Sequence, residues 1–383
     1  MNRLLAALLL CLLMPACALA FDLSPYVLPS LSGNATAYGI TPLTADDCLL
    51  LSSEIEQRSA DPDDLIIVST LRWIARGECT RALRLPEEPY AQYAPVLRPD
   101  GSIRLVQATG YSIESSEAWK HTYTLCDLEG DALVRPRAFE GNPYVLHSLD
   151  DGFAGVCTHT QEQSLLVLYD ADARPVFRCT VPFERAFVQD AIRSGSALYL
   201  LVKQHGWPRT PETLLLRVEQ NALDWLYTTA DESFRYNKLL ADGQGGVILQ
   251  GSPVEDYRRK RMTHLNAEGK GYWNRTLSAG EAIVHPTLSV ANPDGTATLY
   301  GYCVAKSRGL YTVFAMTINA QGDTLALDVR DYTARADTGP SVLPAADGAP
   351  LVYSIEVSRP DQPAVLVPFA ALPAAEDPGI TLH

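Results

Sequence analysis

Polar side chains recur at matched places in four consecutive segments of the chain, shortly before a glycine. Three of them stand five residues before a glycine and the fourth stands six before one: His147, Asp190, Lys238 and Ser289. Arg235 and His285 lie slightly upstream. A histidine, a carboxylate and an amine that converge on one site could hold a polar ligand and shift one another's pKa values. The alternative is that these side chains only face water.

Motifs of the common enzymes are absent. The sequence has no G-x-S-x-G, no H-E-x-x-H, no phosphate-binding loop and no EF-hand loop. We therefore assign no catalytic residue, no metal ligand and no cofactor from the sequence.

Six cysteines follow the first twenty residues: Cys48, Cys79, Cys126, Cys157, Cys179 and Cys303. The even number permits three disulfides in an oxidising compartment. Several lie inside apolar strands, where a free thiol behaves as a small hydrophobic group. Structural disulfides and buried thiols both remain open, and the wide spacing gives no support for a zinc site.

Turn residues repeat along the chain and show how the candidate site is positioned. Turns of the Asp-Gly kind, each followed by an apolar strand, recur at intervals of 43 to 53 residues, at Cys48, Gly101, Gly152, Gly195, Gly245, Gly295 and Gly348. A polar hairpin and a second apolar strand follow in every unit. Repeats of this length are typical of solenoids and propellers.

The apolar runs are short, nearly continuous and rich in β-branched and aromatic residues, which favours strands with two buried faces. A unit of about four antiparallel strands cannot bury both faces alone, whereas seven units stacked in a ring can. The sequence therefore predicts an all-β, seven-bladed β-propeller over residues 21–372. The polar residues named above would line the mouth of its central channel.

The two ends of the chain must complete this ring. The last unit shows only half of its strands, and the segment Phe21–Leu31 has no unit of its own. We therefore expect an N-terminal strand to complete the last blade. The prolines after Val367 indicate a flexible C-terminal tail over residues 373–383.

The first twenty residues have a different character. Arg3, an apolar run over residues 4–13 and the triplet Ala18-Leu19-Ala20 are typical of a signal peptide cleaved after Ala20. Lipidation at Cys17 and an uncleaved anchor are the two alternatives. We expect an exported protein, periplasmic, at the cell surface or extracellular, with no later transmembrane span.

Charge excludes one large class of partner. The formal net charge is -14, so most of the surface would repel a nucleic-acid backbone. The one basic run, over residues 258–261, is expected to be a solvated hairpin tip, with an anion or partner patch as the alternative.

The stretch Asp242–Leu277, with D-G-Q-G-G-V-I-L-Q-G followed by M-T-H-L-N-A-E-G-K-G-Y-W-N-R-T-L, resembles the repeat of exported bacterial β-propellers of the quinoprotein-like class. The sequence lacks the S-x-D-x-G-x-T-W boxes of sialidases and the paired motifs of WD40 repeats. The resemblance implies the fold and not an activity.

These features predict a non-enzymatic binding protein of the cell envelope or extracellular space, with a protein or polysaccharide partner. The alternative is an enzyme that acts on a carbohydrate or another polar substrate at the central channel.

Overall fold

The structure, a computed structural model, describes residues 26–27, 36–44, 47–57, 65–87, 91–98, 100–109, 122–143, 146–149, 151–158, 163–183, 186–204, 213–220, 222–229, 234–253, 255–305, 311–332, 339–344, 350–355 and 364–383. The leader predicted over residues 1–20, including Cys17, lies outside these residues. No helix in the described ranges has the length and apolarity needed to span a bilayer.

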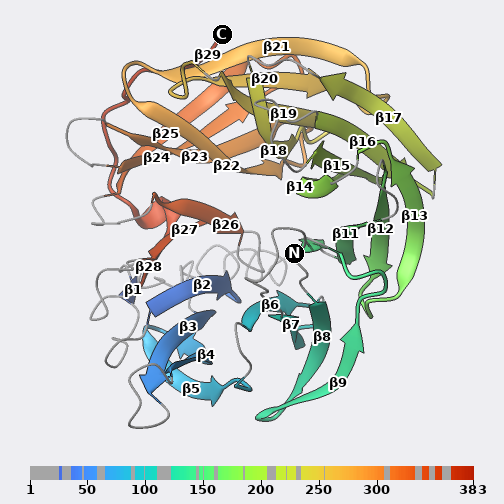
Figure 1. The fold of residues 1–383 in the computed structure, drawn as a ribbon. Helices are drawn as coiled ribbons and strands as arrows, with labels where there is room; N and C mark the ends of the chain where they lie inside the picture. Colours follow the sequence, from blue (N-terminus) through green and yellow to red (C-terminus); the bar gives the residue numbers. More distant parts are fainter. Residues whose placement is uncertain are drawn as a thin grey trace, which may run out of the picture.

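Seven antiparallel sheets stand in a ring around a central axis (Figure 1). The fold is a seven-bladed β-propeller, as the repeat predicts. Each of the first six blades is a meander whose first strand is innermost, and the first strands of blades 3 to 6 contact their neighbours around the ring. We call the end of the ring where these inner strands begin the entry end, and the opposite end the turn end.

The strands of blades 1 to 3 follow one another from the axis outward: β2 (Thr36–Pro42), β3 (Asp47–Gln57), β4 (Leu65–Ala75) and β5 (Glu78–Arg84); β6 (Gln92–Leu97), β7 (Ile103–Thr109), β8 (Thr122–Glu129) and β9 (Ala132–Ala138); β10 (Leu146–Leu149), β11 (Gly152–Thr158), β12 (Ser164–Asp170) and β13 (Pro175–Val181).

Blades 4 to 6 have the same order: β14 (Ala186–Ser194), β15 (Ala197–Gln204), β16 (Thr213–Glu219) and β17 (Ala222–Thr229); β18 (Phe234–Ala241), β19 (Val247–Pro253), β20 (Lys260–Leu265) and β21 (Gly271–Ala279); β22 (Ile283–Ala291), β23 (Ala297–Val304), β24 (Tyr311–Ile318) and β25 (Thr324–Tyr332). Blade 7 contains β26 (Ser341–Pro344), β27 (Pro350–Ile355) and β28 (Ala364–Pro368), followed by a short 3₁₀ helix, η1 (Phe369–Ala371).

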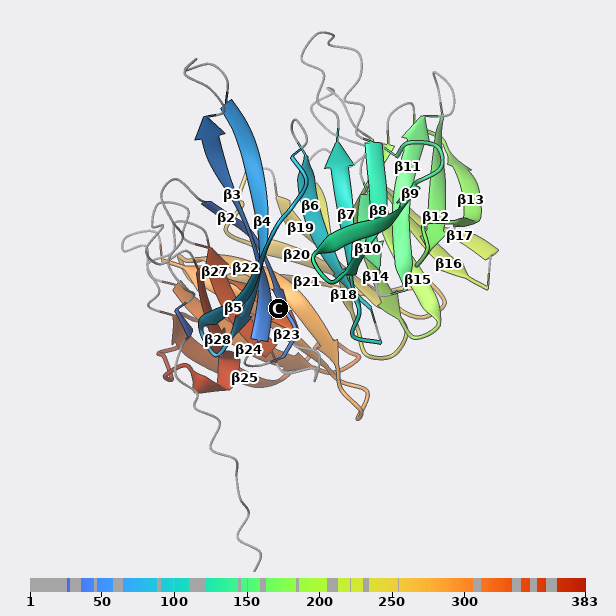
Figure 2. The same ribbon diagram turned by 90° about the horizontal axis from the view of Figure 1, so that it is seen from below.

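Both faces of each sheet are covered by the neighbouring sheets, which stand side by side in Figure 2. Strand β15 illustrates why a strand in this ring can be apolar at six successive positions, Ala197–Val202. Its side chains alternate between two clusters, with Leu200 packed toward blade 3 and Tyr199 and Leu201 packed toward blade 5. All three are fully buried. Burying one such side chain stabilises the fold by about 1.5–3 kcal/mol.

One hairpin shows why glycine is needed at the turn end. Gly243, in the turn between β18 and β19, has a φ of +81°, and a Cβ there would lie 2.5 Å from the carbonyl oxygen of Thr296 in blade 6. The preceding Asp242 accepts hydrogen bonds from the backbone N–H groups of Gln244 and Gly246, at 2.7 and 2.8 Å. Its other carboxylate oxygen lies 2.8 Å from Nε2 of the buried His264. The turn is therefore tied to the core of blade 5.

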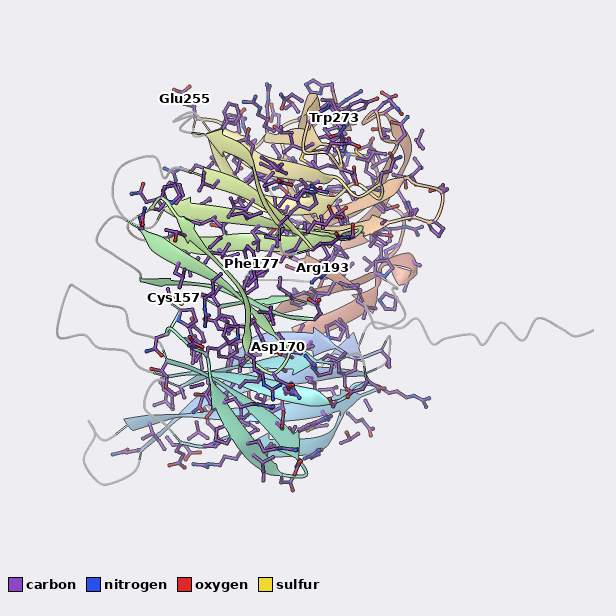
Figure 3. The ribbon with its side chains drawn as sticks, turned by 90° about the vertical axis from the view of Figure 1, so that its right-hand side faces the viewer. Cys157, Asp170, Phe177, Arg193, Glu255 and Trp273 are labelled. Atoms are coloured by element: carbon purple, nitrogen blue, oxygen red, sulfur yellow. The ribbon has the colours of Figure 1, made fainter. Side chains whose placement is uncertain are left out.

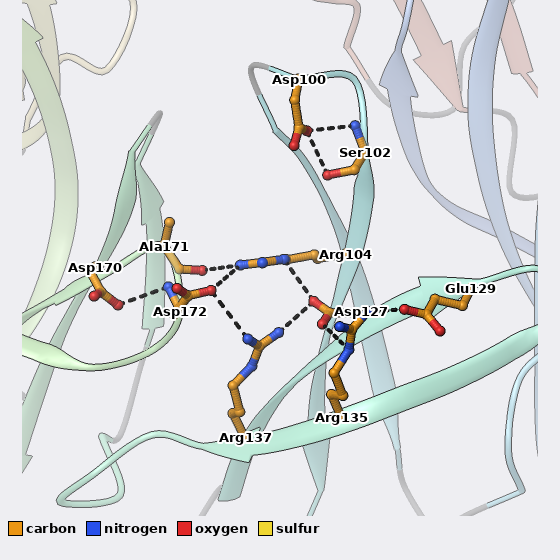
Figure 4. Close-up of polar contacts among 10 residues, drawn as sticks. All are labelled: Asp100, Ser102, Arg104, Asp127, Glu129, Arg135, Arg137, Asp170, Ala171 and Asp172. Atoms are coloured by element: carbon orange, nitrogen blue, oxygen red, sulfur yellow. Dashed lines mark hydrogen bonds and ion pairs between the residues drawn. The ribbon is translucent and has the colours of Figure 1, made fainter.

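A charged network joins blades 2 and 3 (Figure 4). Arg104 on β7 contacts Asp127 of its own blade at 2.8 Å and Asp172, in the hairpin between β12 and β13, at 2.9 Å. Arg137 on β9 contacts the same two carboxylates. Asp127 is mostly buried, so loss of one partner would cost more than the roughly 0–1 kcal/mol of an exposed pair.

All six cysteines lie in the described residues and carry free thiols. Cys157, labelled in Figure 3, lies within blade 3 near the Tyr169 hydroxyl. Burial raises the pKa of Cys48 and of Cys303 to about 12. These two thiols therefore stay protonated at neutral pH and act as small apolar groups of the core.

An N-terminal strand completes the last blade, as the sequence predicts. Strand β1 (Tyr26–Val27) pairs antiparallel with β28, and Tyr26 stands opposite Leu366. The pairing is short, with only two residue pairs. It gives blade 7 its fourth strand, outside β28, and so covers an edge of that sheet.

The C-terminal segment differs from the flexible tail expected over residues 373–383. Ala374 bridges to Arg330 on the outer strand of blade 6, and β29 (Ile380–Leu382) pairs with β21 as a fifth strand of blade 5. Figure 1 shows β29 beside β21 at the C-terminal end of the chain. Ile380 is 4% exposed and belongs to the core shared by blades 5 and 6. The prolines are compatible with an extended backbone that crosses blade 6 to reach blade 5. Ile380 and Leu382, which follow them, pack into the core shared by these two blades.

Substitution at the docked strand tests this arrangement. We expect Ile380→Ala to lower the free energy of unfolding by about 2–4 kcal/mol, because it removes a buried branched side chain. Thr381→Ala, on the exposed side of the same strand, is the matched control and should change stability by less than about 0.5 kcal/mol. Urea titration of the two variants measures both values. Equal, negligible effects would show that the segment does not dock.

Candidate functional site

The inner strands of blades 3 to 6 place the predicted polar residues along the central channel. His147 lies on β10, Asp190 on β14, Lys238 on β18 and Ser289 on β22. These are the first strands of four consecutive sheets. The spacing of each residue from its turn glycine therefore corresponds to a position on an inner strand.

Three of these residues form a charged cluster with Asp190 at its centre. Nε2 of His147 lies 3.9 Å from one carboxylate oxygen of Asp190, and Nζ of Lys238 lies 3.5 Å from the other. The side chain of Asp190 is 9% exposed, whereas those of His147 and Lys238 are 30% and 39% exposed. The cluster therefore has a buried acceptor and two accessible nitrogen groups.

Backbone bulges lie in the inner strands close to these side chains. The register shifts between Val188 and Asp190 in β14, and between Tyr236 and Lys238 in β18. Strand β22 has the same irregularity between Pro286 and Leu288. A bulge re-aims the side chain beside it and sharpens the local twist. Asp190 and Lys238 each follow a bulge directly, which explains how they turn toward each other.

Two of the polar side chains also hold neighbouring inner strands together. Asp190 accepts a hydrogen bond from the backbone N–H of Leu239, at 2.7 Å, and Ser289 accepts one from the N–H of Ala241, also at 2.7 Å. Inner strands are sheet edges, so these N–H groups have no partner in their own sheet. Ser289 is consequently a structural link between blades 5 and 6, and Asp190 combines a structural contact with its place in the cluster.

Burial lowers the pKa of His147. The charge of Asp190 acts in the opposite direction, and that of Lys238 acts with burial. The net effect is a neutral imidazole at pH 7, which can accept one hydrogen bond and donate another. With the ammonium of Lys238, the cluster can bind hydroxyl, amide or carboxylate groups of a ligand.

His285 and Arg235 do not join this cluster. The ring of His285 stacks on Tyr302 of its own blade, with centroids 4.7 Å apart. Burial, with a smaller effect of the Lys260 charge, lowers the pKa of His285 to about 4. Arg235 is exposed near the start of β18, and its charge acts on Lys203 of blade 4. Both residues lie near the start of their inner strands, at the entry end.

Sequence reasoning missed three buried polar residues near the entry end. Lys203 follows the apolar run of β15 and is 8% exposed, and Lys260 at the start of β20 is 4% exposed. Gln250, opposite Lys238, is 3% exposed, and its Oε1 has no hydrogen-bond partner among the described residues. The position of Lys203 directly after the apolar run of β15 was the sequence signal that could have indicated its burial.

The basic run over residues 258–261 is only partly a hairpin tip. Arg258 and Arg259 are exposed in the turn and contact Asp256 at 3.0 and 3.4 Å. Lys260 enters the sheet, where its Nζ donates to Ser252 Oγ and the carbonyl of Tyr257, at 2.7 and 3.1 Å. Lys260 and Arg261 thus lie in strand β20 rather than in the exposed turn.

In the part of the chain that the structure describes, no arrangement of side chains is suited to metal binding or to nucleophilic catalysis. There, no group of three or more His, Cys, Asp and Glu side chains is placed to hold a metal ion. The described histidines, His147, His264, His285 and His383, contact carboxylates, aromatic rings or a threonine hydroxyl, and none contacts a serine or cysteine.

Solved structures share the propeller fold. A prolyl endopeptidase is similar with a TM-score of 0.51 and 12% identity, over 93% of this chain and 49% of that one. The β-propeller domain of the Trilobed protease from Pyrococcus furiosus gives 0.49 and 11%, over 85% and 91%. Pyrococcus horikoshii acylaminoacyl peptidase gives 0.48 and 12%, over 87% and 50%.

At such identities the likeness shows the fold alone. The chain spans about half the length of the acylaminoacyl peptidase and prolyl endopeptidase chains. No family model matches the sequence, and no curated protein is similar to it.

The buried histidine gives stability a pH dependence. His285 has a pKa of about 4 in the folded protein against an ordinary value of 6.5, so the unfolded chain binds a proton that the folded protein rejects. Stability should therefore fall as the pH is lowered from 6.5 to about 4. We expect His285→Gln to reduce this loss, measured by urea unfolding at pH 7 and pH 4.5.

The control for this experiment is His383→Gln, because His383 is exposed at the chain end. It should leave the pH dependence of the wild type unchanged. A His285→Gln protein that loses as much stability as the wild type between the two pH values would contradict the assignment.

Proposed function

We propose that the protein is an exported binding protein that holds a polar ligand in its central channel. The cluster of His147, Asp190 and Lys238 carries the proposal, because three neighbouring blades converge there on one accessible polar site. Ligand sites commonly lie where a few polar groups meet in a concave region of a rigid scaffold. The ring supplies that rigidity.

The chemistry of the cluster favours an uncharged or zwitterionic ligand rich in hydroxyl or amide groups. Asp190 already balances Lys238, so the cluster has little net charge to attract a simple ion. Lys238 can donate to a ligand oxygen, and neutral His147 can donate or accept. A saccharide or a peptide group offers the alternating donors and acceptors that such a site recognises. A polysaccharide or protein partner at the cell envelope fits this chemistry.

Export is part of the proposal and rests on the sequence of residues 1–20, with its basic start, apolar run and small-residue cleavage site. The resemblance of Asp242–Leu277 to exported propellers of the quinoprotein-like class supports the same location. The protein would then work in the periplasm, on the cell surface or outside the cell.

The second candidate is an enzyme that acts on a carbohydrate or another polar substrate at the same place. The contact of His147 with Asp190 favours it, because a neutral imidazole oriented by a carboxylate can serve as a general base. Two of the structurally similar proteins are peptidases, but a shared fold does not imply the same activity for this chain.

A ligand screen with matched variants tests the site. The protein from residue 21 onward would be scanned by thermal shift against neutral sugars, amino sugars and peptidoglycan fragments, because a ligand that binds the folded form raises the melting temperature. For a compound that stabilises the wild type, we expect Lys238→Met to weaken affinity at least about tenfold, the loss of one charge-assisted hydrogen bond.

Lys270→Met is the control, since it removes the same charge from the exposed hairpin between β20 and β21. Asp190 is unsuitable as a probe because its substitution would also free the backbone N–H of Leu239. Unchanged affinity in Lys238→Met would place the ligand elsewhere. Turnover of the bound compound that disappears in His147→Gln would favour the enzyme.

A further inference from the structure

A hollow of about 410 Å³ lies at the turn end of the ring, between blades 4 and 5. Its lining includes residues 193–197, in and around the turn between β14 and β15, and residues 243–245, in the turn between β18 and β19. Two small residues, Ala267 of blade 5 and Ala291 of blade 6, also line it. We call this hollow the turn-end pocket. Its volume is within the usual range for ligand sites, about 300–1,000 Å³.

Glycines bring the two turns of this pocket together at the level of the backbone. Gly195 and Gly245 have φ values of +59° and +91°, and a Cβ on Gly195 would lie 3.3 Å from the Cα of Gly245. The hydroxyl of Tyr199, a fully buried residue of blade 4, donates a hydrogen bond to the carbonyl of Gly245 at 2.8 Å. This contact holds the turn of blade 5 against blade 4, so the pocket has a fixed shape.

Two arginines of blade 4 line the pocket, and carboxylates of the protein orient both of them. Arg193, labelled in Figure 3, donates through Nε and Nη2 to Asp151 in a turn of blade 3. Arg217 donates through Nη1 to Asp224, at 3.0 Å, and through Nη2 to Glu219. The two arginine side chains are 38% and 19% exposed, so a ligand can reach them. Groups that are oriented in advance lose less entropy when a ligand binds.

Hydrogen-bond acceptors lie beside these donors. Glu219 accepts from the Ser196 hydroxyl on Oε1 and from Arg217 on Oε2, and each carboxylate oxygen can accept a second hydrogen bond. Gln244 donates its amide N–H to the carbonyl of Gly295 in blade 6, at 2.9 Å, which orients the side-chain amide. Because both arginines already have carboxylate partners, the pocket offers little uncompensated charge to a simple ion.

We propose that the turn-end pocket binds a neutral, hydroxyl-rich ligand of one or two sugar rings. A hydroxyl group both donates and accepts hydrogen bonds, so adjacent hydroxyls of a sugar can pair with the guanidinium, carboxylate, hydroxyl and amide groups that alternate in this lining. A ligand that carries a full charge would have to displace one of the existing ion pairs.

This site is separate from the channel cluster and does not rest on the proposed function. His147, Asp190 and Lys238 do not belong to the lining of the pocket. Asp190 stands four residues before Ser194, the last residue of β14, which corresponds to roughly 13 Å along the strand. The two sites therefore occupy different levels of the same inner strands.

Titration calorimetry with glucose, N-acetylglucosamine, maltose and cellobiose tests the proposal, with inorganic phosphate as a charged probe. We expect at least one of the four sugars to bind saturably and phosphate not to bind. Arg193→Met removes the guanidinium and keeps the apolar stem, and it should weaken sugar binding about tenfold. Arg178→Met is the matched control, because Arg178 forms a similar exposed pair with Glu140 and does not line the pocket.

A blocking variant tests the place of binding without removing a polar side chain. The Cβ of Ala267 lies 3.5 Å from the position that a Cβ on Gly245 would take, so the side chain at residue 267 faces the turn of blade 5. Ala267→Phe should fill the pocket and lower the affinity for the sugar at least about tenfold. An unchanged melting temperature of this variant would show that it folds.

Hydrogen exchange on the wild type gives a readout that needs no variant. The bound sugar should slow exchange of backbone amides in residues 193–197 and 241–246, because it covers the two turns.

Saturable binding of none of the four sugars would overturn the proposal. So would tighter binding of phosphate than of every sugar, equal weakening by Arg193→Met and Arg178→Met, unchanged affinity in Ala267→Phe, or slowed exchange only outside the two turns. A sugar whose binding is weakened by Lys238→Met alone would belong to the channel cluster, which would support the proposed function and contradict this site.

Discussion

Each sheet of this protein has two apolar faces, and neither face can be covered unless a neighbouring sheet stands on each side. That requirement makes the ring the smallest stable unit, because an open array would expose a sheet such as β14–β17, whose central strands are buried on both sides. Both ends of the chain help to close and cover the ring. Strand β1 completes blade 7, and β29 reaches back across blade 6 to blade 5.

The same constraint creates the polar sites. Sheets in a ring meet most closely at their inner strands, and the channel-facing edge of each inner strand has no further strand to pair with. Side chains of adjacent blades satisfy the free backbone groups instead, as Asp190 does for Leu239 and Ser289 for Ala241. Once Asp190 holds this position, Lys238 and His147 can gather around it. Recognition chemistry in the channel is therefore built on groups that also hold the ring together.

The sequence was most informative where one physical signal dominated. The spacing of turn glycines and the continuous apolar runs predicted seven blades, and the unpaired segment near Tyr26 predicted the N-terminal strand. Counting from the turns brought His147, Asp190 and Lys238 to one channel. The docking of Ile380 and Leu382 was missed because the prolines before them suggested a free end. Lys203 and Lys260 were missed because burial of a lysine depends on which sheet lies opposite. The stacking of His285 on Tyr302 was missed because it joins residues of two different strands.

Ring closure through β1 is the claim on which the channel and its cluster depend, and a designed cross-link tests it most directly. Tyr26 and Leu366 are opposite each other in antiparallel strands. The Cα atoms of directly opposed residues in such pairs are about 4.5–5.5 Å apart, a range that a disulfide can span. Oxidation of a protein carrying Tyr26→Cys and Leu366→Cys should yield a bond between these two positions in the monomer, found by peptide mapping, and a higher melting temperature. Failure of the two thiols to join in the folded monomer would contradict the closed ring.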